Sequence, residues 1–130
     1  MAVGIARRGF DIDLRHGQAR EAALVHTLLG SRVEAKSDGR CRSTGNLFIE
    51  YRHRGLPSGI ATTTASRWAI EYDTDAWLIV PTERLREAAR RAVREERTAL
   101  GGDHDQSMGA LVPISWLVRP HDACDDLDGS

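Results

Sequence analysis

The spacing of apolar residues along the chain predicts two main helices, at residues 18–29 and 82–99. Both segments show the helical period of about 3.6 residues, which gathers apolar side chains on one face. The first stripe consists of Ala22, Val25, Leu28 and Leu29, and the second consists of Leu85, Ala88, Ala89, Ala92 and Val93. Gly30 and Gly101 are placed to end the two helices, and Thr82 is placed to cap the second.

Shorter apolar or alternating segments predict strands. They lie at residues 9–14, 31–36, 46–52, 68–72, 76–80 and 110–118. We expect strands 31–36 and 46–52 to pair as antiparallel neighbours across the polar loop between them. Residues 60–68 are predicted to form a short helix, and Pro113 favours an edge position for the last strand. The pattern as a whole predicts an α/β domain.

The composition is typical of a soluble domain. The 130 residues are 41% apolar and 28% charged, which is enough to bury a core. No window approaches the roughly 18 consecutive apolar residues of a membrane span, and the first residues lack the apolar stretch of a signal peptide. We therefore expect no membrane partner and a cytoplasmic location, the host cytoplasm if the chain is phage-encoded. Cys41 and Cys124 show no Cys-x-x-Cys spacing, which argues against a cysteine-based zinc site.

Charge is distributed unevenly along the chain. Residues 103–130 carry six aspartates and only one arginine, so the remaining residues carry 17 basic and 13 acidic side chains, a net charge of +4. We expect residues 1–102 to form the core of a single domain, residues 103–120 to add a final edge strand, and residues 121–130 to be a disordered acidic tail.

Positive charge gathers in residues 32–54. The basic residues of this segment are Arg32, Lys36, Arg40, Arg42, Arg52 and Arg54, and its acidic residues are Glu34, Asp38 and Glu50. On charge alone the segment is either an ordinary solvated surface or a contact surface for phosphates.

Three carboxylates are placed where they can meet. Asp38 follows one predicted strand, Glu50 lies in the next, and Glu21 lies on the preceding helix. If the two strands pair, these side chains converge at one end of the sheet, where Lys36 and Arg52 add positive charge. Carboxylate oxygens are the ligands that Mg²⁺ prefers, and two or three of them with a phosphate oxygen make a sufficient site.

The pattern of Asp38, eleven residues, then Glu50-Tyr51-Arg52, preceded by Glu21 on a helix, resembles the PD-(D/E)XK nuclease superfamily. The likeness is to its small single-domain members, the Holliday-junction-resolvase-like and phage nucleases. It extends to the segments Thr44-Gly45-Asn46 and Ser58-Gly59-Ile60. The resemblance implies a restriction-endonuclease-like αβββαβ core, with a mixed central sheet flanked by helices.

The same resemblance implies roles for individual residues in a metal-dependent deoxyribonuclease. Asp38 and Glu50 would hold Mg²⁺, for which Mn²⁺ can substitute, and Glu21 would contribute directly or through water. Lys36 would orient the attacking water, and Arg52 would hold the phosphate. Flanking phosphates of the DNA would be contacted by Arg40, Arg42 and Arg54. A homodimer is expected if both strands are cut.

Two features depart from the superfamily pattern. Its lysine belongs two residues after the strand glutamate, where this chain has Arg52, a group that cannot lose its proton. Lys36 is the candidate replacement. Glu34-Ala35-Lys36 is also a Glu-x-Lys sequence in its own right, with Asp11 or Asp13 as an upstream aspartate, and this alternative register stays open.

Other interpretations remain beside the nuclease. Glu34, Lys36 and Glu50 could be cross-strand ion pairs on a half-exposed sheet. The substitution by Arg52 is also what a nuclease-like module would show if it had lost catalysis and served in DNA binding or assembly. A structural phage protein, finally, would account for the acidic end of the chain.

Overall fold

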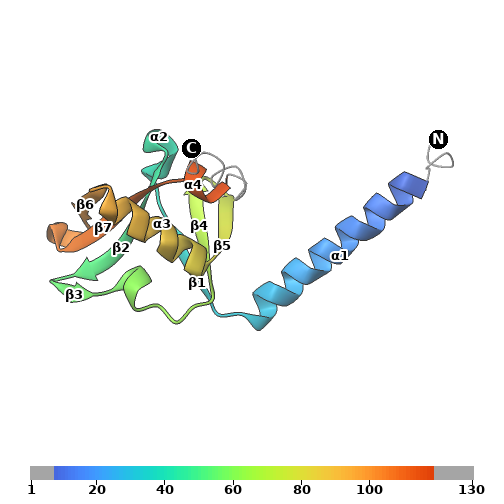
Figure 1. Ribbon diagram of the computed structural model, residues 1–130, viewed down its shortest axis with the longest axis horizontal. Coiled ribbons are helices and arrows are strands. Elements are labelled where there is room, and N and C mark those ends of the chain that lie inside the picture. Colours follow the sequence, from blue (N-terminus) through green and yellow to red (C-terminus); the bar gives the residue numbers. More distant parts are fainter. Residues whose placement is uncertain (1–7, 119–130) are drawn as a thin grey trace. The chain divides into compact units, whose positions relative to one another are not determined.

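The computed structural model describes residues 8–118, and the chain divides into two compact units, with the division between Arg32 and Val33. Each unit is described by itself. The first contains the helix α1 (Arg8–Gly30). The second contains β1 (Val33–Ser37), α2 (Cys41–Thr44), β2 (Asn46–His53), β3 (Leu56–Pro57), the 3₁₀ turn η2 (Gly59–Ala61), β4 (Arg67–Asp73), β5 (Ala76–Pro81), α3 (Thr82–Arg94), β6 (Thr98–Gly101), the 3₁₀ turn η3 (Asp103–Asp105), β7 (Ser107–Pro113) and α4 (Ser115–Val118) (Figure 1). The expected tail at 121–130 lies outside the described residues.

The mixed α/β character is confirmed, but two sheets take the place of one central sheet in the part of the chain described. The first has the order β1-β4-β5, with β1 parallel to β4 and β4 antiparallel to β5. The second is antiparallel, with the order β3-β2-β7-β6.

The expected pairing of strands 31–36 and 46–52 is wrong. In the structure β1 pairs with β4, and β2 pairs with β3 and β7. The segment between β1 and β2 is long enough to form a helical turn of its own, α2, which ends at Gly45 in a left-handed conformation. This turn carries the chain from one sheet to the other, so β1 and β2 are not two arms of a hairpin.

The strand predicted at 9–14 is also wrong, because these residues belong to α1. A short alternation of apolar and polar residues is a weak signal when no neighbouring strand is available. Extending a helix that has already formed costs little, since each added residue gains a backbone hydrogen bond. The helix predicted at 18–29 and its end at Gly30 are confirmed. Asp11 and Asp13 therefore lie on a helix, which removes the strand aspartate that the Glu34-Ala35-Lys36 register needs.

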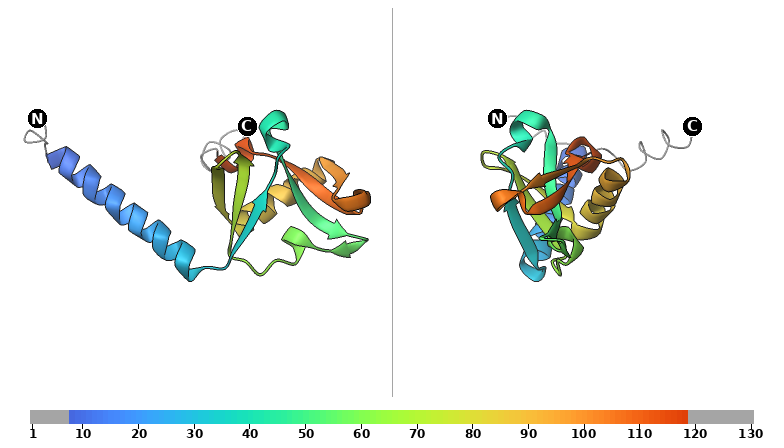
Figure 2. Two further views of the ribbon diagram at one scale, coloured as in Figure 1. Left: turned by 180° about the vertical axis from the view of Figure 1, so that it is seen from behind. Right: turned by 90° about the vertical axis from the view of Figure 1, so that its left-hand side faces the viewer.

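Helix α3 packs on β7, β5 and β4, and Figure 2 shows it on one side of the strands. Its buried residues are Thr82, Leu85, Ala89 and Ala92, whereas Val93 is exposed. Together with side chains from both sheets they form the core, which includes Leu47, Ile49, Trp68, Ile70, Val80, Ala110 and Val112.

The predicted ends of the second helix need correction. Pro81 occupies the N-cap position, and the hydroxyl of Thr82 instead donates to the carbonyl of Ala65 at 2.6 Å. The helix ends at Arg94, and Glu96 follows with a left-handed backbone, φ 58°. Residues 98–101 form β6 instead of a last helical turn, because β7 lies beside them and offers backbone partners.

The hairpin of strands 68–72 and 76–80 is confirmed as β4 and β5. The strand predicted at 110–118 begins earlier, at Ser107, and gives way to α4. It lies between β2 and β6, not at an edge, and Pro113 is tolerated because β6 pairs only as far as Ala110. The helix predicted at 60–68 shrinks to the 3₁₀ turn η2.

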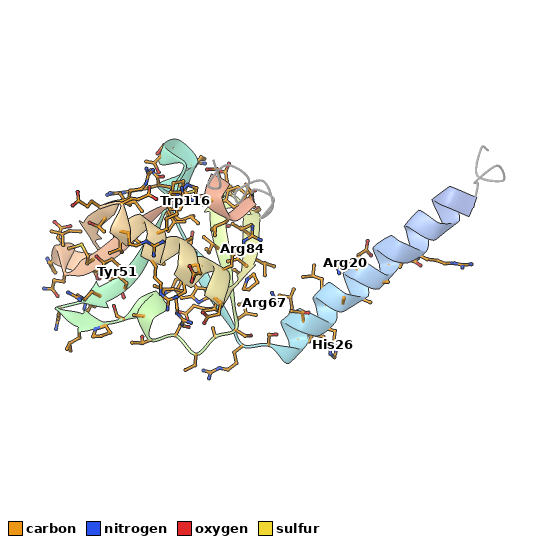
Figure 3. All side chains as sticks on the ribbon, in the orientation of Figure 1. Arg20, His26, Tyr51, Arg67, Arg84 and Trp116 are labelled. Carbon is orange, nitrogen blue, oxygen red and sulfur yellow. The ribbon has the colours of Figure 1, made fainter. Side chains whose placement is uncertain are left out.

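Helix α4 holds the last described residues against α3. Trp116 lies beside α3 (Figure 3), and the guanidinium carbons of Arg91 and Arg97 lie 3.9 and 5.5 Å from the centre of its ring. Such cation–π contacts contribute about 0.5–1 kcal/mol each at an exposed site.

Candidate active site

Three of the residues singled out from the sequence line one pocket. The pocket has a volume of about 220 Å³, and its wall includes Lys36 from β1, Asp38 from the following loop and Glu50 from β2. Buried apolar side chains, Trp68 and Ile70 of β4, form its floor. The fold thus brings Lys36, Asp38 and Glu50 together although their strands belong to different sheets.

The carboxylate of Glu50 is stabilised in its charged form. Partial burial raises its pKa, but the hydroxyls of Ser107 and Ser58, followed by the charges of His53 and Lys36, outweigh burial. The pKa of Glu50 is therefore below its ordinary value of 4.5. A carboxylate that stays ionised in a partly buried pocket is suited to hold a cation.

A β-bulge decides which neighbours share the face of Glu50. The register of β2 against β7 shifts between Glu50, which pairs with Gly109, and Arg52, which pairs with Met108. Because successive residues of β7 alternate between faces, Arg52 lies on the face opposite to Glu50. Arg52 is exposed and is not part of the pocket wall, so the structure does not bring it to the other candidate residues.

His53 occupies the position that Arg52 was expected to fill. It pairs with Ser107, and its Nδ1 lies 2.9 Å from the Ser107 hydroxyl. Ser107 is buried and also supports the charge of Glu50. The sequence did not reveal either residue. The bulge adds Tyr51 to the strand, and because the residues around it are polar or aromatic, the pattern of apolar and polar positions does not show where the extra residue lies.

Both carboxylate oxygens of Asp38 accept hydrogen bonds from the backbone around it. Its Oδ1 accepts the N–H groups of Arg40 and Cys41 at 3.1 and 3.2 Å, and its Oδ2 accepts the N–H of Phe48 at 2.7 Å. A carboxylate oxygen has two lone pairs. Oδ1 is therefore fully used, and Oδ2 keeps one lone pair for a further ligand.

Lys36 lies between two carboxylates. Its Nζ is 3.6 Å from Oε1 of Glu34 on the same strand, and its charge lowers the pKa of Glu50. Glu34 also accepts a hydrogen bond from the Thr63 hydroxyl at 3.5 Å. The expected ion pairing of Glu34 and Lys36 is present, but it runs along β1 and not across strands.

The other candidate residues lie outside this pocket. Glu21 is an exposed residue of α1, in the other compact unit. Arg42 forms an ion pair with Asp73 at 3.5 Å, and Arg54 donates to the side chain of Gln106. Arg40 is exposed and lines a larger cavity that adjoins the pocket.

The donor set fits a cation held by two carboxylates. Within residues 8–118 there is no group of three or more histidine, cysteine, aspartate or glutamate side chains arranged to hold a metal ion. Glu50 offers a charged carboxylate and Asp38 one free lone pair. Mg²⁺ commonly takes one or two protein carboxylates and keeps several waters, so the number and chemistry of these two side chains match what this ion takes.

The segment Ser58-Gly59-Ile60 packs directly against the backbone of Glu50. Gly59 has a left-handed backbone with φ +54°, and a Cβ at this position would overlap the carbonyl oxygen of Glu50. The backbone N–H of Ser58 donates to Tyr51 at 3.1 Å, and the Ser58 hydroxyl is buried without a satisfied hydrogen bond. The Ser58 hydroxyl therefore lowers the pKa of Glu50 through the dipole of a nearby polar group. The Ser-Gly pair was the sequence signal for this support.

The chain matches no protein-family model, no curated protein and no solved structure. In the described part of the chain no helix is long and apolar enough to cross a membrane.

Proposed function

We propose that the protein is a metal-dependent deoxyribonuclease that hydrolyses phosphodiester bonds, with a site of the PD-(D/E)XK type. The observation that carries this proposal is the pocket whose wall combines Lys36, Asp38 and the ionised Glu50. One cationic and two anionic groups beside a small cavity are what phosphodiester hydrolysis with a divalent cation requires.

We propose further that the core is of the restriction-endonuclease-like kind. The order along the chain supports this: a helix, a series of strands that carries the candidate residues, a second helix and further strands. An enzyme of this type would act in the cytoplasm on DNA during recombination, repair or phage DNA processing, as a homodimer where both strands are cut.

Each residue has a task that follows from its position. Glu50 and Asp38 would hold Mg²⁺ or Mn²⁺, which when bound polarises the phosphoryl oxygen and stabilises the leaving oxygen. Lys36 binds the non-bridging oxygen of the phosphate and orients the attacking water. In the reaction the water oxygen bonds to phosphorus, the bond from phosphorus to the leaving oxygen breaks, and a proton from water passes to that oxygen.

The test is cleavage of linear, single-stranded, flap and branched DNA with Mg²⁺ or Mn²⁺, with EDTA as the negative control. Glu50→Gln keeps the size of the side chain but removes its charge, so it should abolish cleavage. Glu87→Gln is the matched control, because Glu87 is exposed on α3. Cleavage that survives Glu50→Gln, or that EDTA does not stop, would refute the proposal.

One observation favours a second candidate, a nuclease-like module that binds DNA without cutting it. The carboxylate of Asp38 already accepts three backbone hydrogen bonds, which is a structural role by itself. The module should shift the mobility of DNA in EDTA and in Mg²⁺ alike, and should leave every substrate of the panel intact.

A further inference from the structure

A second, larger cavity adjoins the candidate active site. It has a volume of about 590 Å³ and shares Ser37, Asp38 and Phe48 with the pocket that contains Glu50. Its remaining wall comes from the loop after β1, from the start of β2, and from β6 and η3. This volume lies within the range of about 300–1,000 Å³ that is typical of cavities for small organic ligands.

Phe48 forms a fixed aromatic wall between the two cavities. A Cβ at Gly101 would come within 2.8 Å of the ring, and one at Gly109 would overlap it. The two glycines therefore allow the ring to lie directly on the backbones of β6 and β7. Phe48 lines both cavities and is only half-buried. A flat ring held in this way is a stacking surface for another ring.

Polar groups around the larger cavity are free to receive a ligand. The side-chain amide of Asn46 has no hydrogen-bond partner among residues 8–118, and the guanidinium of Arg40 forms no ion pair there. An amide offers donors and an acceptor that match the edge of a nucleobase. Arg40 is exposed at the rim, where a phosphate can approach it from solvent.

The charge of the wall argues against a phosphate inside this cavity. The carboxylates of Asp38 and Asp105 both line it, and they would repel an anion. A neutral heterocycle with N–H donors is suited to the same wall. Ala99 and Leu111 add apolar surface beside the stacking wall of Phe48, because Ala99 pairs with Gly109 and Leu111 pairs with Phe48, on the same face of the sheet.

We propose that this cavity binds one unpaired nucleobase of the DNA substrate, stacked on Phe48 and read by Asn46, next to the phosphate held at Glu50 and Lys36. This inference rests on the proposed nuclease function and names its substrate class, DNA with a single-stranded segment at the cleavage position. A base within a duplex is stacked and paired, and must leave the helix before a protein can enclose it.

The experiment compares three ligands of equal length in EDTA, where no cleavage occurs: an oligothymidylate of about twelve residues, its abasic analogue and a duplex. Dissociation constants come from fluorescence anisotropy. We expect the oligothymidylate to bind about tenfold more tightly than the abasic strand, because stacking of one base contributes an effect of this size. Equal affinities for the two strands would overturn the proposal, since they would leave only contacts to the backbone.

Two variants locate the effect in the cavity. Asn46→Ala and Ala99→Glu should reduce the preference for the base-bearing strand to about twofold or less. The control is Leu56→Glu, which adds the same charge at an exposed position of β3, at the opposite edge of the same sheet. Ala99 is half-buried and Leu56 is 69% exposed, and neither belongs to the buried core. An equal loss in Leu56→Glu and Ala99→Glu would contradict the proposal.

A cleavage assay with Mg²⁺ separates this inference from the function on which it rests. A preference for the base-bearing strand without any cleavage would overturn the nuclease and leave the base site standing. Cleavage of every substrate without such a preference would overturn the base site and leave the nuclease standing.

Discussion

The backbone N–H of Phe48 donates to Oδ2 of Asp38 at 2.7 Å, and this bond ties the loop after β1 to the strand that carries Glu50. The same two residues form the boundary between the small pocket and the larger cavity. The position of the aromatic wall and the position of a candidate metal ligand therefore depend on each other. A change at Asp38 is expected to affect folding as well as chemistry.

Asp38→Ala should lower the free energy of unfolding by about 3 kcal/mol, because it leaves three backbone N–H groups without their charged acceptor. Urea denaturation at neutral pH measures this loss. Asp73→Ala is the control, since Asp73 is an exposed acid that forms a surface ion pair with Arg42 and accepts one backbone hydrogen bond, from Thr74 at 2.7 Å, so its loss should cost about 1 kcal/mol or less. Equal stabilities of the two variants would contradict the structural role of Asp38. Glu50→Gln remains the sharper probe of chemistry, because no such set of backbone hydrogen bonds depends on it.

Ser107→Ala should make the protein more sensitive to acid. The pKa of Glu50 is lowered in the folded state, so its charge stabilises the fold above its ordinary pKa of 4.5, and this stability is lost as pH falls through the lower folded value. Without the Ser107 hydroxyl the folded pKa rises towards the ordinary value, which reduces the stabilisation. The midpoint of acid unfolding, followed by circular dichroism, should therefore move to higher pH.

Ser115→Ala is the control for this prediction, because Ser115 is exposed in α4 and lines no pocket described above. The two variants should differ in the acid midpoint, even where they agree in stability at neutral pH. An unchanged midpoint in Ser107→Ala would show that Ser107 does not support the charge of Glu50.

The local pattern of the chain predicts several elements well and their assembly poorly. The hairpin of β4 and β5 and the body of α3 follow from apolar periodicity, which reports burial of one face directly. The partner of β1 does not follow, because β4 lies beyond α2, β2 and η2 in the chain, and no local signal links distant strands. The predicted end of α3 at residue 99 is also wrong, because residues 98 and 99 pair with β7 and the helix ends at Arg94.

The candidate site was predicted in part, for the same physical reason. Lys36, Asp38 and Glu50 line one pocket, but the expected pairing of their strands is not the cause, since β1 pairs with β4 and Glu50 lies in the middle of β2, which pairs with β7. Arg52 was assigned to the site because it stands two residues after Glu50, where the resemblance places a lysine, and the bulge between them turns it to the other face. The roles of His53 and Ser107 depend on a register between β2 and β7 that only tertiary structure reveals.

Gly59→Ala should destabilise the protein by about 3 kcal/mol, because it adds both backbone strain and an overlap with the carbonyl of Glu50. Gly55→Ala separates the two effects: Gly55 has φ +79° but nothing lies within 4 Å of a Cβ there, so only about 1 kcal/mol of strain is expected. Thermal unfolding of both variants measures the difference. Equal losses would mean that the close contact with Glu50 carries no cost.

Lys36 and Arg52 distinguish the observed site from the one that the resemblance implies, in which Arg52 acts beside Glu50. Lys36 lines the pocket, so Lys36→Gln should lower kcat by about a hundredfold, the usual effect of losing one group that stabilises a developing charge. Arg52 lies on the opposite face, so Arg52→Gln should leave kcat within about threefold and weaken DNA binding only through the loss of one distant charge. Single-turnover cleavage with Mg²⁺ measures both. A large loss in Arg52→Gln with little loss in Lys36→Gln would restore the arrangement in which Glu50 and Arg52 act side by side, and would place the bulge elsewhere in the strand.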